Sequence, residues 1–405
     1  MRAVRTTSQV GRQIVVAGGG LAGLRTVAGL RALRYDGAVT LIGAESRPPY
    51  DRPPLSKKLM AGQLDDTTLE PDLGSLGVDT RLGETATGVD AGPGSGGVLR
   101  TDHGEHRFDD LVLATGAVPV VLPGQGRQRF LRTIDDALTL RALLRPGLRL
   151  AIVGAGWIGA ELATAAAGRG CLVTVVEAAA APLAVAVGAD VGALTTGWYA
   201  AAGVELRLRE RVASVEPGGV ALSSGGWLPA DEVVTAVGVR PAVAWLEGSA
   251  VALDNGVAVD EQLRASVPGV WAVGDCMAFW SRRFQRRLRL EHWDGALRSP
   301  AAVAASLTGA PGGYDPVPYF WSEQFGRMIQ YAGFHGGADR ITVRGDPAED
   351  RWAVFWLAGD VPVALLTVNS PRDLLQGRRL IEAGAGADAT RLADPGVPVA
   401  QAAGG

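Results

Sequence analysis

Three glycines near the start of the chain, Gly18, Gly20 and Gly23, have the spacing G-x-G-x-x-G. In dinucleotide-binding folds the first glycine allows a tight turn, and the second lets the backbone approach a pyrophosphate. The third allows a helix to pack closely on a strand. Such sites also carry an acid about 20 residues further on, which binds a ribose hydroxyl, and Glu45 stands at about that distance. The motif therefore predicts a dinucleotide site.

A second set of glycines, Gly154, Gly156 and Gly159, repeats this spacing, and Glu177 follows at a similar distance. A carboxylate at that position accepts the 2′-hydroxyl of NAD and repels the additional phosphate of NADP. Two such motifs indicate two cofactors. FAD and NADH are the natural pair, because a hydride passes from nicotinamide to flavin without a protein nucleophile. A solvated glutamate at a strand end is the alternative interpretation of Glu177.

The segments around both motifs have the pattern of β–turn–α–β units. Strands are expected at 13–17 and 39–42 around a helix at 21–33, and again at 148–153 and 173–177 around a helix at 155–169. A repeated unit of this kind predicts an α/β fold with two Rossmann-like domains and parallel sheets. Three further strands that end in glycine are expected at 111–116, 233–238 and 270–274.

The character of the sequence changes at about residue 316. The β-rich runs 352–357 and 361–368 flank a short turn and predict a hairpin, so a C-terminal α+β domain is expected here. The tail 383–405 is rich in small residues, which predicts loose order.

The composition of the 405 residues predicts a folded protein of two or three domains, since 47% are apolar and 20% charged. The net charge of −3 gives no signature of a nucleic-acid partner. Residues 1–12 are polar, unlike a signal peptide, and the apolar stretch 178–189 is too short to span a membrane. No His, Cys and carboxylate cluster has metal-ligand spacing, so no metal site is expected.

The two cysteines, Cys171 and Cys276, are too few and too far apart in sequence for a disulfide framework or a C-x-x-C redox centre. This usage predicts a reducing, cytoplasmic compartment. It also argues against disulfide reductase chemistry.

The stretch Pro49-Tyr50-Asp51-Arg52-Pro53-Pro54-Leu55-Ser56-Lys57 resembles the signature of the FAD-dependent NADH:ferredoxin reductases. Further matches to that family run in family order through nearly the whole chain, from about residue 13 to 381. They are the segments 114–116, 131–133, 239–241, 274–275, 290–291 and 320–324.

The resemblance implies that the first glycine motif holds FAD and the second holds NADH. It also implies a discontinuous FAD domain, with residues 1–117 and 249–315 on either side of an NADH domain at 118–248. Residues 316–405 would then form the C-terminal domain.

The resemblance further implies that Lys57 lies close to the flavin N5 and pairs with Glu161. A fixed ammonium there would stabilise the negative charge that a hydride brings, and the carboxylate would orient it. Lys57 and its neighbour Lys58 are the only lysines in the sequence, and every other cation of this type is arginine. The alternative is a solvated loop cation.

Several other residues fall on cofactor-binding positions of the family. Asp275 is expected to reach the ribityl or phosphate portion of FAD, and Trp321 the edge of the flavin; for Trp321 a buried core tryptophan is the alternative. The remaining positions are Ala22, Arg52, Ala86, Arg132, Trp293 and Gly238.

The chain departs from the family pattern in the segment 291–294 and at three single positions near the expected nucleotide sites. Ala44 stands where an aspartate is frequent, and Glu45 could take over that ribose contact. Ala181 and Val185 stand where arginines usually hold the adenosine of NADH. Either NADH binds weakly, or another part of the chain holds its adenosine.

A run of five arginines follows Asp275, at positions 282, 283, 286, 287 and 289. It is either a solvated loop or a docking surface for an acidic iron–sulfur protein.

The function implied by the resemblance is transfer of electrons from NADH through FAD to a small acidic ferredoxin of 2Fe–2S or similar type. That ferredoxin would serve a monooxygenase or dioxygenase. A monomer or weak dimer without membrane or nucleic-acid partners is expected. The alternatives are an NADH oxidase, or a flavin-bearing redox interaction protein similar to apoptosis-inducing factor.

Overall fold

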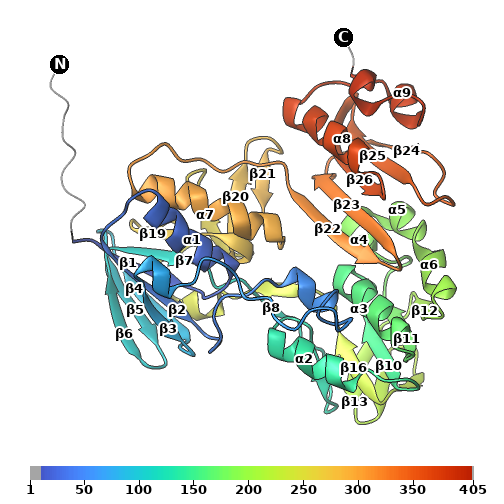
Figure 1. Cartoon of the computed structure of the whole chain (residues 1–405), viewed down its shortest axis with the longest axis horizontal. Helices are drawn as coiled ribbons and strands as arrows, with labels where there is room; N and C mark the ends of the chain where they lie inside the picture. Colours follow the sequence, from blue (N-terminus) through green and yellow to red (C-terminus); the bar gives the residue numbers. More distant parts are fainter. Residues whose placement is uncertain (1–10, 404–405) are drawn as a thin grey trace. The chain divides into compact units, whose positions relative to one another are not determined.

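The computed structural model describes residues 11–403 and divides into two compact units, whose elements are labelled in Figure 1. The first unit takes the chain up to Asp51, Thr67–Val118 and Arg240–Pro316. The second takes Arg52–Asp66, Pro119–Val239 and the chain from Val317 onward. The segment Arg52–Asp66 and the C-terminal part thus fall in the same unit as the second glycine motif.

The first unit is built on a five-stranded parallel sheet in the order β19-β7-β1-β2-β3. Helices α1 (Leu21–Ala32) and α7 (Trp293–Leu307) pack against each other, and a Cβ added to Gly29 would lie 3.1 Å from Ala304 Cβ. Small residues therefore permit the close helix contact. The strands are β1 (Gln13–Ala17), β2 (Ala38–Gly43), β3 (Asp79–Leu82), β7 (Asp110–Leu113) and β19 (Val270–Ala272).

Two small sheets complete this unit. The first is antiparallel, with β4 (Ala86–Ala91), β5 (Gly97–Thr101) and β6 (Gly104–Phe108). The second joins β18 (Val257–Val259), β20 (Met277–Ser281) and β21 (Arg286–Leu288).

The second unit contains another five-stranded parallel sheet, in the order β12-β11-β10-β16-β9. Its strands are β9 (Gln128–Arg129), β10 (Arg149–Val153), β11 (Leu172–Glu177), β12 (Glu205–Leu208) and β16 (Glu232–Thr235). An antiparallel sheet of β13 (Val212–Glu216), β14 (Gly219–Leu222) and β15 (Trp227–Pro229) shares a buried apolar cluster with it. The helices are α2 (Ile134–Leu143), α3 (Trp157–Gly168), α4 (Ala184–Val187), α5 (Ala189–Ala193) and α6 (Thr196–Ala201). Two of the passages of the chain between the units lie within β8 (Ala117–Pro119) and β17 (Val239–Pro241).

The C-terminal part of the second unit is an antiparallel sheet in the order β22-β23-β26-β25-β24. Helices α8 (Pro371–Ala383) and α9 (Ala389–Ala393) cover a buried apolar cluster on it. The predicted hairpin is present as β25 and β26, and the predicted fold class is confirmed. The strands are β22 (Tyr319–Gln324), β23 (Arg327–Gly333), β24 (Arg340–Arg344), β25 (Trp352–Ala358) and β26 (Val361–Val368).

The loose order expected for the tail is wrong for residues 383–403. Leu392, Val399 and Ala402 are fully buried in the C-terminal cluster. Arg344 at the end of β24 donates to the backbone carbonyls of Leu392, Asp394, Pro395 and Val397, which brings the tail onto the sheet. A tail of small residues packs here because a buried guanidinium satisfies its carbonyl groups.

We expect Arg344→Ala to lower the free energy of unfolding of this part by about 3 kcal/mol, since four carbonyls and Asp373 lose a buried partner. Arg340→Ala is the matched control in the same strand. Its partner Asp360 is largely exposed, so about 0.5 kcal/mol or less is expected. Calorimetric unfolding with limited proteolysis of the tail measures both effects, and equal losses would contradict the prediction.

Within residues 11–403, no helix combines the length and apolar character needed to cross a membrane. The interpretation of residues 1–12 as unlike a signal peptide rests mainly on positions 1–10, outside the described residues.

Candidate functional site

The first glycine motif forms the turn between β1 and α1. Gly18 has φ +132°, and a Cβ there would lie 2.1 Å from the carbonyl oxygen of Ala114. A Cβ on Gly23 would lie 1.9 Å from the carbonyl oxygen of Gly18. No residue with a side chain fits at either position, so both glycines are required by the fold itself.

Gly20 differs from these two glycines, because a Cβ there would meet no atom within 4 Å. It is the N-cap residue of α1, whose first turn has neither a side-chain cap nor an acidic residue. The helix therefore presents its N–H donors and positive dipole end to open space. This arrangement fits the pyrophosphate of a dinucleotide.

Glu45 follows β2 and is held by Tyr50, whose hydroxyl donates to Glu45 Oε2 over 2.6 Å. This bond fixes the carboxylate close to the end of β2, where the ribose is bound in such folds. Ala44, the position at which the family often has an aspartate, is exposed. Glu45 therefore supplies a carboxylate that is held in place at the end of β2.

Asp275 lies in a 3₁₀ turn (Gly274–Cys276) that follows β19. A Cβ added to Gly274 would lie 3.1 Å from the Cβ of Ala22, so the turn sits against the start of α1. Gly274 N–H also donates to Ser299 of α7 over 3.0 Å. The fold therefore brings Asp275 and Ala22, far apart in sequence, to the same glycine motif.

Trp293 begins α7, and its indole N–H donates to Asp51 Oδ1 over 2.6 Å. Next to it, desolvation lowers the pKa of His292 to about 4 against the opposing charge of Asp275, so this imidazole is neutral at pH 7. Ala86 is the first residue of β4, and its role as an FAD contact stays a prediction.

The second glycine motif has the same geometry between β10 and α3. A Cβ on Gly154 would lie 2.5 Å from the carbonyl oxygen of Ala236, and one on Gly159 would lie 2.0 Å from that of Gly154. A Cβ on Gly156, the N-cap of α3, would meet nothing within 4 Å. Gly238 has φ +102° and is exposed just beyond Ala236.

Glu177 ends β11 with its carboxylate bound to two backbone groups. Oε2 accepts the N–H of Ala155 in the glycine turn over 2.8 Å, and Oε1 accepts that of Ala179 over 2.8 Å. Ala181 is buried and the side chain of Val185 is almost fully exposed, so neither replaces the charge of an arginine. The carboxylate is therefore fixed beside the turn, as a ribose-binding acid requires.

A buried ion pair joins Lys57 to Glu161 of α3, with 2.8 Å between Nζ and Oε2. Only 3% of the Glu161 side chain and 12% of the Lys57 side chain is exposed. Ser56 donates to the same carboxylate oxygen, and Lys57 Nζ also donates to the Pro53 carbonyl over 3.3 Å. The pair implied by the family resemblance is thus present and is shielded from water.

Ser322 of β22 is a further partner of this carboxylate that sequence reasoning did not assign. Its hydroxyl donates to Glu161 Oε1 over 2.6 Å, and the Glu323 N–H lies 3.4 Å from the same oxygen. Glu161 therefore binds both the loop that carries Lys57 and the C-terminal sheet. The available signal was its place inside the family-like stretch 320–324.

Two other expected site residues also meet in the second unit. The Arg52 guanidinium donates to the backbone carbonyl of Arg132. Arg132 precedes α2, where Thr133 and Asp136 form a reciprocal capping box that fixes the chain. Trp321 stacks against Tyr319 in β22 with 6.2 Å between ring centroids and stays partly exposed, so it is not a buried core tryptophan.

Comparisons with known proteins agree with this geometry. Residues 12–299 match the pyridine nucleotide-disulphide oxidoreductase family, and residues 319–403 match the reductase C-terminal domain. The chain belongs to the pyridine nucleotide-disulphide oxidoreductase family. FAD and NAD(P)H are the cofactors of such a chain, and its chemistry is that of an oxidoreductase.

Relatives within this oxidoreductase family cover almost the whole chain. The 5,5′-dehydrodivanillate O-demethylase ferredoxin reductase subunit of Sphingobium sp. is 35% identical over 95% of this chain and 97% of its own. The crystal structure of Fdr9 matches with a TM-score of 0.92 and 47% identity, over 96% of this chain and 99% of its own. Putidaredoxin reductase, in a covalent complex with putidaredoxin, matches with a TM-score of 0.92 and 31% identity, over 96% and 98%.

The family name refers to disulphide chemistry, but this chain has no pair of neighbouring thiols that could carry it out. Cys171 and Cys276 are both free and buried. Burial raises the pKa of the Cys276 thiol, whose Sγ contacts the carbonyls of Leu113 and Val273. A protonated, enclosed thiol is a poor nucleophile.

Neighbouring carboxylates neutralise part of the positive charge of the arginine run 282–289. Arg282 pairs with Glu261, Arg289 with Glu291, and Arg287 with Asp254 over 3.2 Å. Arg287 also donates to the backbone carbonyls of Val259 in β18 and Ala278 in β20, so it ties β21 to both strands. Three of the five arginines are thus bound within the protein, which weakens the case for a docking surface here.

Proposed function

We propose that this oxidoreductase takes a hydride from NADH and passes single electrons to a small ferredoxin of the 2Fe–2S or similar type. FAD, when bound, supplies the conversion, since flavins accept two electrons together and release them singly. The observation that carries the proposal is the shielded Lys57–Glu161 pair beside an intact second glycine motif. The ferredoxin reductase subunit and the putidaredoxin complex among its relatives support ferredoxin as the acceptor.

In this proposal the two motifs divide the cofactors. The open space at Gly20, with Glu45 and Asp275 nearby, binds FAD, and that at Gly156, with Glu177 nearby, binds NADH. The FAD domain then comprises residues 1–117 and 249–315, the NADH domain 118–248, and the C-terminal domain 316–405.

Lys57 is proposed to hold a positive charge where a hydride brings negative charge onto the flavin. Glu161 keeps that ammonium charged and oriented, and Ser56 and Ser322 hold Glu161 in turn. Because the carboxylate is 3% exposed, water competes little for the lysine. Ser322 is a positioning residue on this view.

The proposed setting is the cytoplasm, where a monomer or weak dimer serves a monooxygenase or dioxygenase through an acidic ferredoxin. Both cysteines are free, which agrees with a reducing compartment. An NADH oxidase that used a reactive cysteine is disfavoured by the full burial of Cys276.

The test is anaerobic mixing of the FAD-loaded protein with NADH, followed by addition of a 2Fe–2S ferredoxin. We expect bleaching of the flavin within seconds and electron delivery to the ferredoxin. Bleaching over minutes would favour the redox interaction protein, the alternative to which the uncharged Ala181 and Val185 point. Oxygen consumption without ferredoxin reduction would favour the oxidase.

A further inference from the structure

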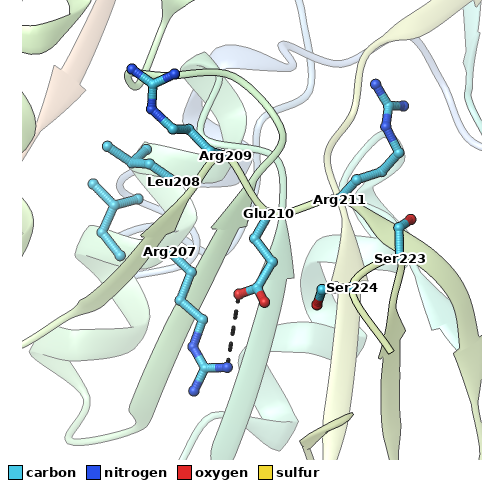
Figure 2. Close-up of a pocket in the computed structure, with 8 residues that line it drawn as sticks. Arg207, Leu208, Arg209, Glu210, Arg211, Ser223 and Ser224 are labelled. Carbon is cyan, nitrogen blue, oxygen red and sulfur yellow. Dashed lines mark ion pairs between the residues drawn. The ribbon is translucent and has the colours of Figure 1, made fainter. Parts of the chain in front are cut away.

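Figure 2 shows a surface hollow of about 680 Å³ at the carboxyl end of β12 in the second unit. Its arginines do not converge, because the guanidinium groups of Arg207, Arg209 and Arg211 point in different directions. Arg207 is also paired with Glu205 over 2.8 Å. These side chains therefore form no single anion site. A buried polar side chain of the same unit, Gln324, has a more sharply defined environment.

Gln324 is the last residue of β22 and is only 1% exposed. Its Nε2 donates to the Ser322 hydroxyl over 3.0 Å. Its Oε1 is buried and accepts no hydrogen bond from any of residues 11–403. A buried acceptor without a partner destabilises a fold, whereas an apolar side chain of similar size fills the same space without that cost. The donor N–H is therefore the part of this side chain that the structure uses.

The β22–β23 hairpin brings Gln324 and Ser322 to one face of the strand. Side chains two positions apart in a strand point in the same direction. Phe325 and Gly326 connect the two strands, and both have the positive φ that is typical of tight hairpins, +49° and +76°. The Phe325 N–H also donates to the hydroxyl of Thr164 in α3 over 3.0 Å. The strand is thus held on α3 by a contact that does not involve Gln324.

The Ser322 hydroxyl has a single proton, and its two neighbours set the direction of that proton. The Gln324 Nε2 can only donate, so the Ser322 oxygen accepts from it. The hydroxyl proton is directed at Glu161 Oε1, 2.6 Å away. A hydroxyl that accepts one hydrogen bond is a stronger donor in the next. Gln324 therefore both orients and strengthens the bond from Ser322 to the carboxylate.

The series of contacts continues through Glu161 to Lys57. Oε1 of Glu161 accepts the Ser322 hydroxyl, whereas Oε2 accepts the Ser56 hydroxyl. Lys57 Nζ lies 2.8 Å from the same Oε2. A carboxylate that is fixed at Oε1 does not rotate, so its Oε2 stays directed at the ammonium group. Gln324 is the member of this buried series farthest from Lys57.

We propose that Gln324 is a positioning residue for hydride transfer, which acts through Ser322 and Glu161 on the ammonium group of Lys57. The inference rests on the proposed function, because that function places Lys57 where negative charge develops on the flavin. A preorganised charge stabilises that step only while it is held in place. The effect should fall on the rate of flavin reduction, since the series includes none of the residues assigned to NADH.

The test is stopped-flow reduction of the FAD-loaded Gln324→Met variant by NADH. Methionine keeps the length of the side chain and removes the donor. We expect the limiting rate to fall about fivefold, an effect the size of one neutral hydrogen bond. Kd for NAD+, from calorimetric titration of the same protein, should change by less than about twofold, because nucleotide contacts are unchanged. Gln324→Glu, whose carboxylate accepts but does not donate, should slow reduction at least as much.

Ser322→Ala provides the measurement that separates positioning from packing. It should slow flavin reduction about tenfold or more, since it removes a hydrogen bond to a charged group. In this background Gln324→Met should add less than about twofold, because the residue through which it acts is absent. Thr367→Val is the matched control, since Thr367 is fully buried in the same sheet and its hydroxyl has no hydrogen-bond partner among residues 11–403. Its rate should stay within about twofold of the unaltered protein.

Unaltered rates in Gln324→Met and Gln324→Glu would overturn the inference, and Gln324→Glu alone decides if the methionine variant does not fold. A full fivefold loss that persists in the Ser322→Ala background would overturn it too, as would an equal loss in Thr367→Val or a weaker Kd for NAD+ at an unaltered rate. In all these cases NADH still bleaches the flavin of the unaltered protein. Failure of NADH to do so would instead contradict the proposed function.

Discussion

Replacing Lys57 with methionine is expected to slow reduction of the flavin by NADH about a hundredfold, the usual cost of removing one preorganised electrostatic partner. The ammonium group of Lys57 is largely buried, where it pairs with Glu161 and donates to the Pro53 carbonyl. The variant removes the positive charge and leaves the buried carboxylate without its cation. Stopped-flow absorbance of the FAD-loaded protein measures the rate.

Lys58→Met is the matched control, because Lys58 is the adjacent residue and is exposed. Its rate should stay within about twofold of the unaltered protein, as is usual for surface substitutions. Lys57→Arg should keep the charge and still slow the reaction, since the broad, planar guanidinium does not fit the site of a compact ammonium group. Equal rates for Lys57→Met and Lys58→Met would remove Lys57 from the proposed function.

The second large effect is expected from a pair of glycine variants, which show which glycine motif binds FAD and which binds NADH. Gly20→Ala should fold but retain little FAD, whereas Gly156→Ala should retain FAD and raise KM for NADH about a hundredfold. In both cases the new Cβ meets no protein atom within 4 Å. It would occupy the space that the pyrophosphate approaches in the proposed function. FAD content, from the absorbance spectrum, and steady-state kinetics provide the measurements.

Gly168→Ala is the control for this pair, because it lies in α3 and its Cβ would also meet nothing within 4 Å. It should change neither FAD content nor KM. Gly23 and Gly159 are unsuitable, since a Cβ at either would collide with backbone and disturb the fold. If Gly20→Ala kept its FAD and Gly156→Ala lost it, the assignment of the two motifs would be reversed.

Much of the fold was predictable because its signals are local. The strands around Gly18 and Gly154, the helices that follow them and the hairpin of β25 and β26 all lie in short windows with a clear apolar pattern. The tail was mispredicted for the opposite reason. Its residues are small and weakly patterned, and their order depends on Arg344, about 50 positions away in the sequence.

The sequence by itself showed two dinucleotide-binding motifs, each followed by an acidic residue. It also showed that both lysines of the chain lie in one short stretch. Glycine spacing and strand patterns carry this information, since they act within a few residues of the backbone. Only the tertiary structure decided which arginine side chains are held in ion pairs and which remain available to a ligand. In the dense arginine run 282–289, three of the five arginines pair with Glu261, Asp254 and Glu291, whereas the exposed Arg209 and Arg211 form no ion pair with any of the described residues 11–403. A charge's partners are set by chain topology, and no local pattern specifies which distant segment packs against it.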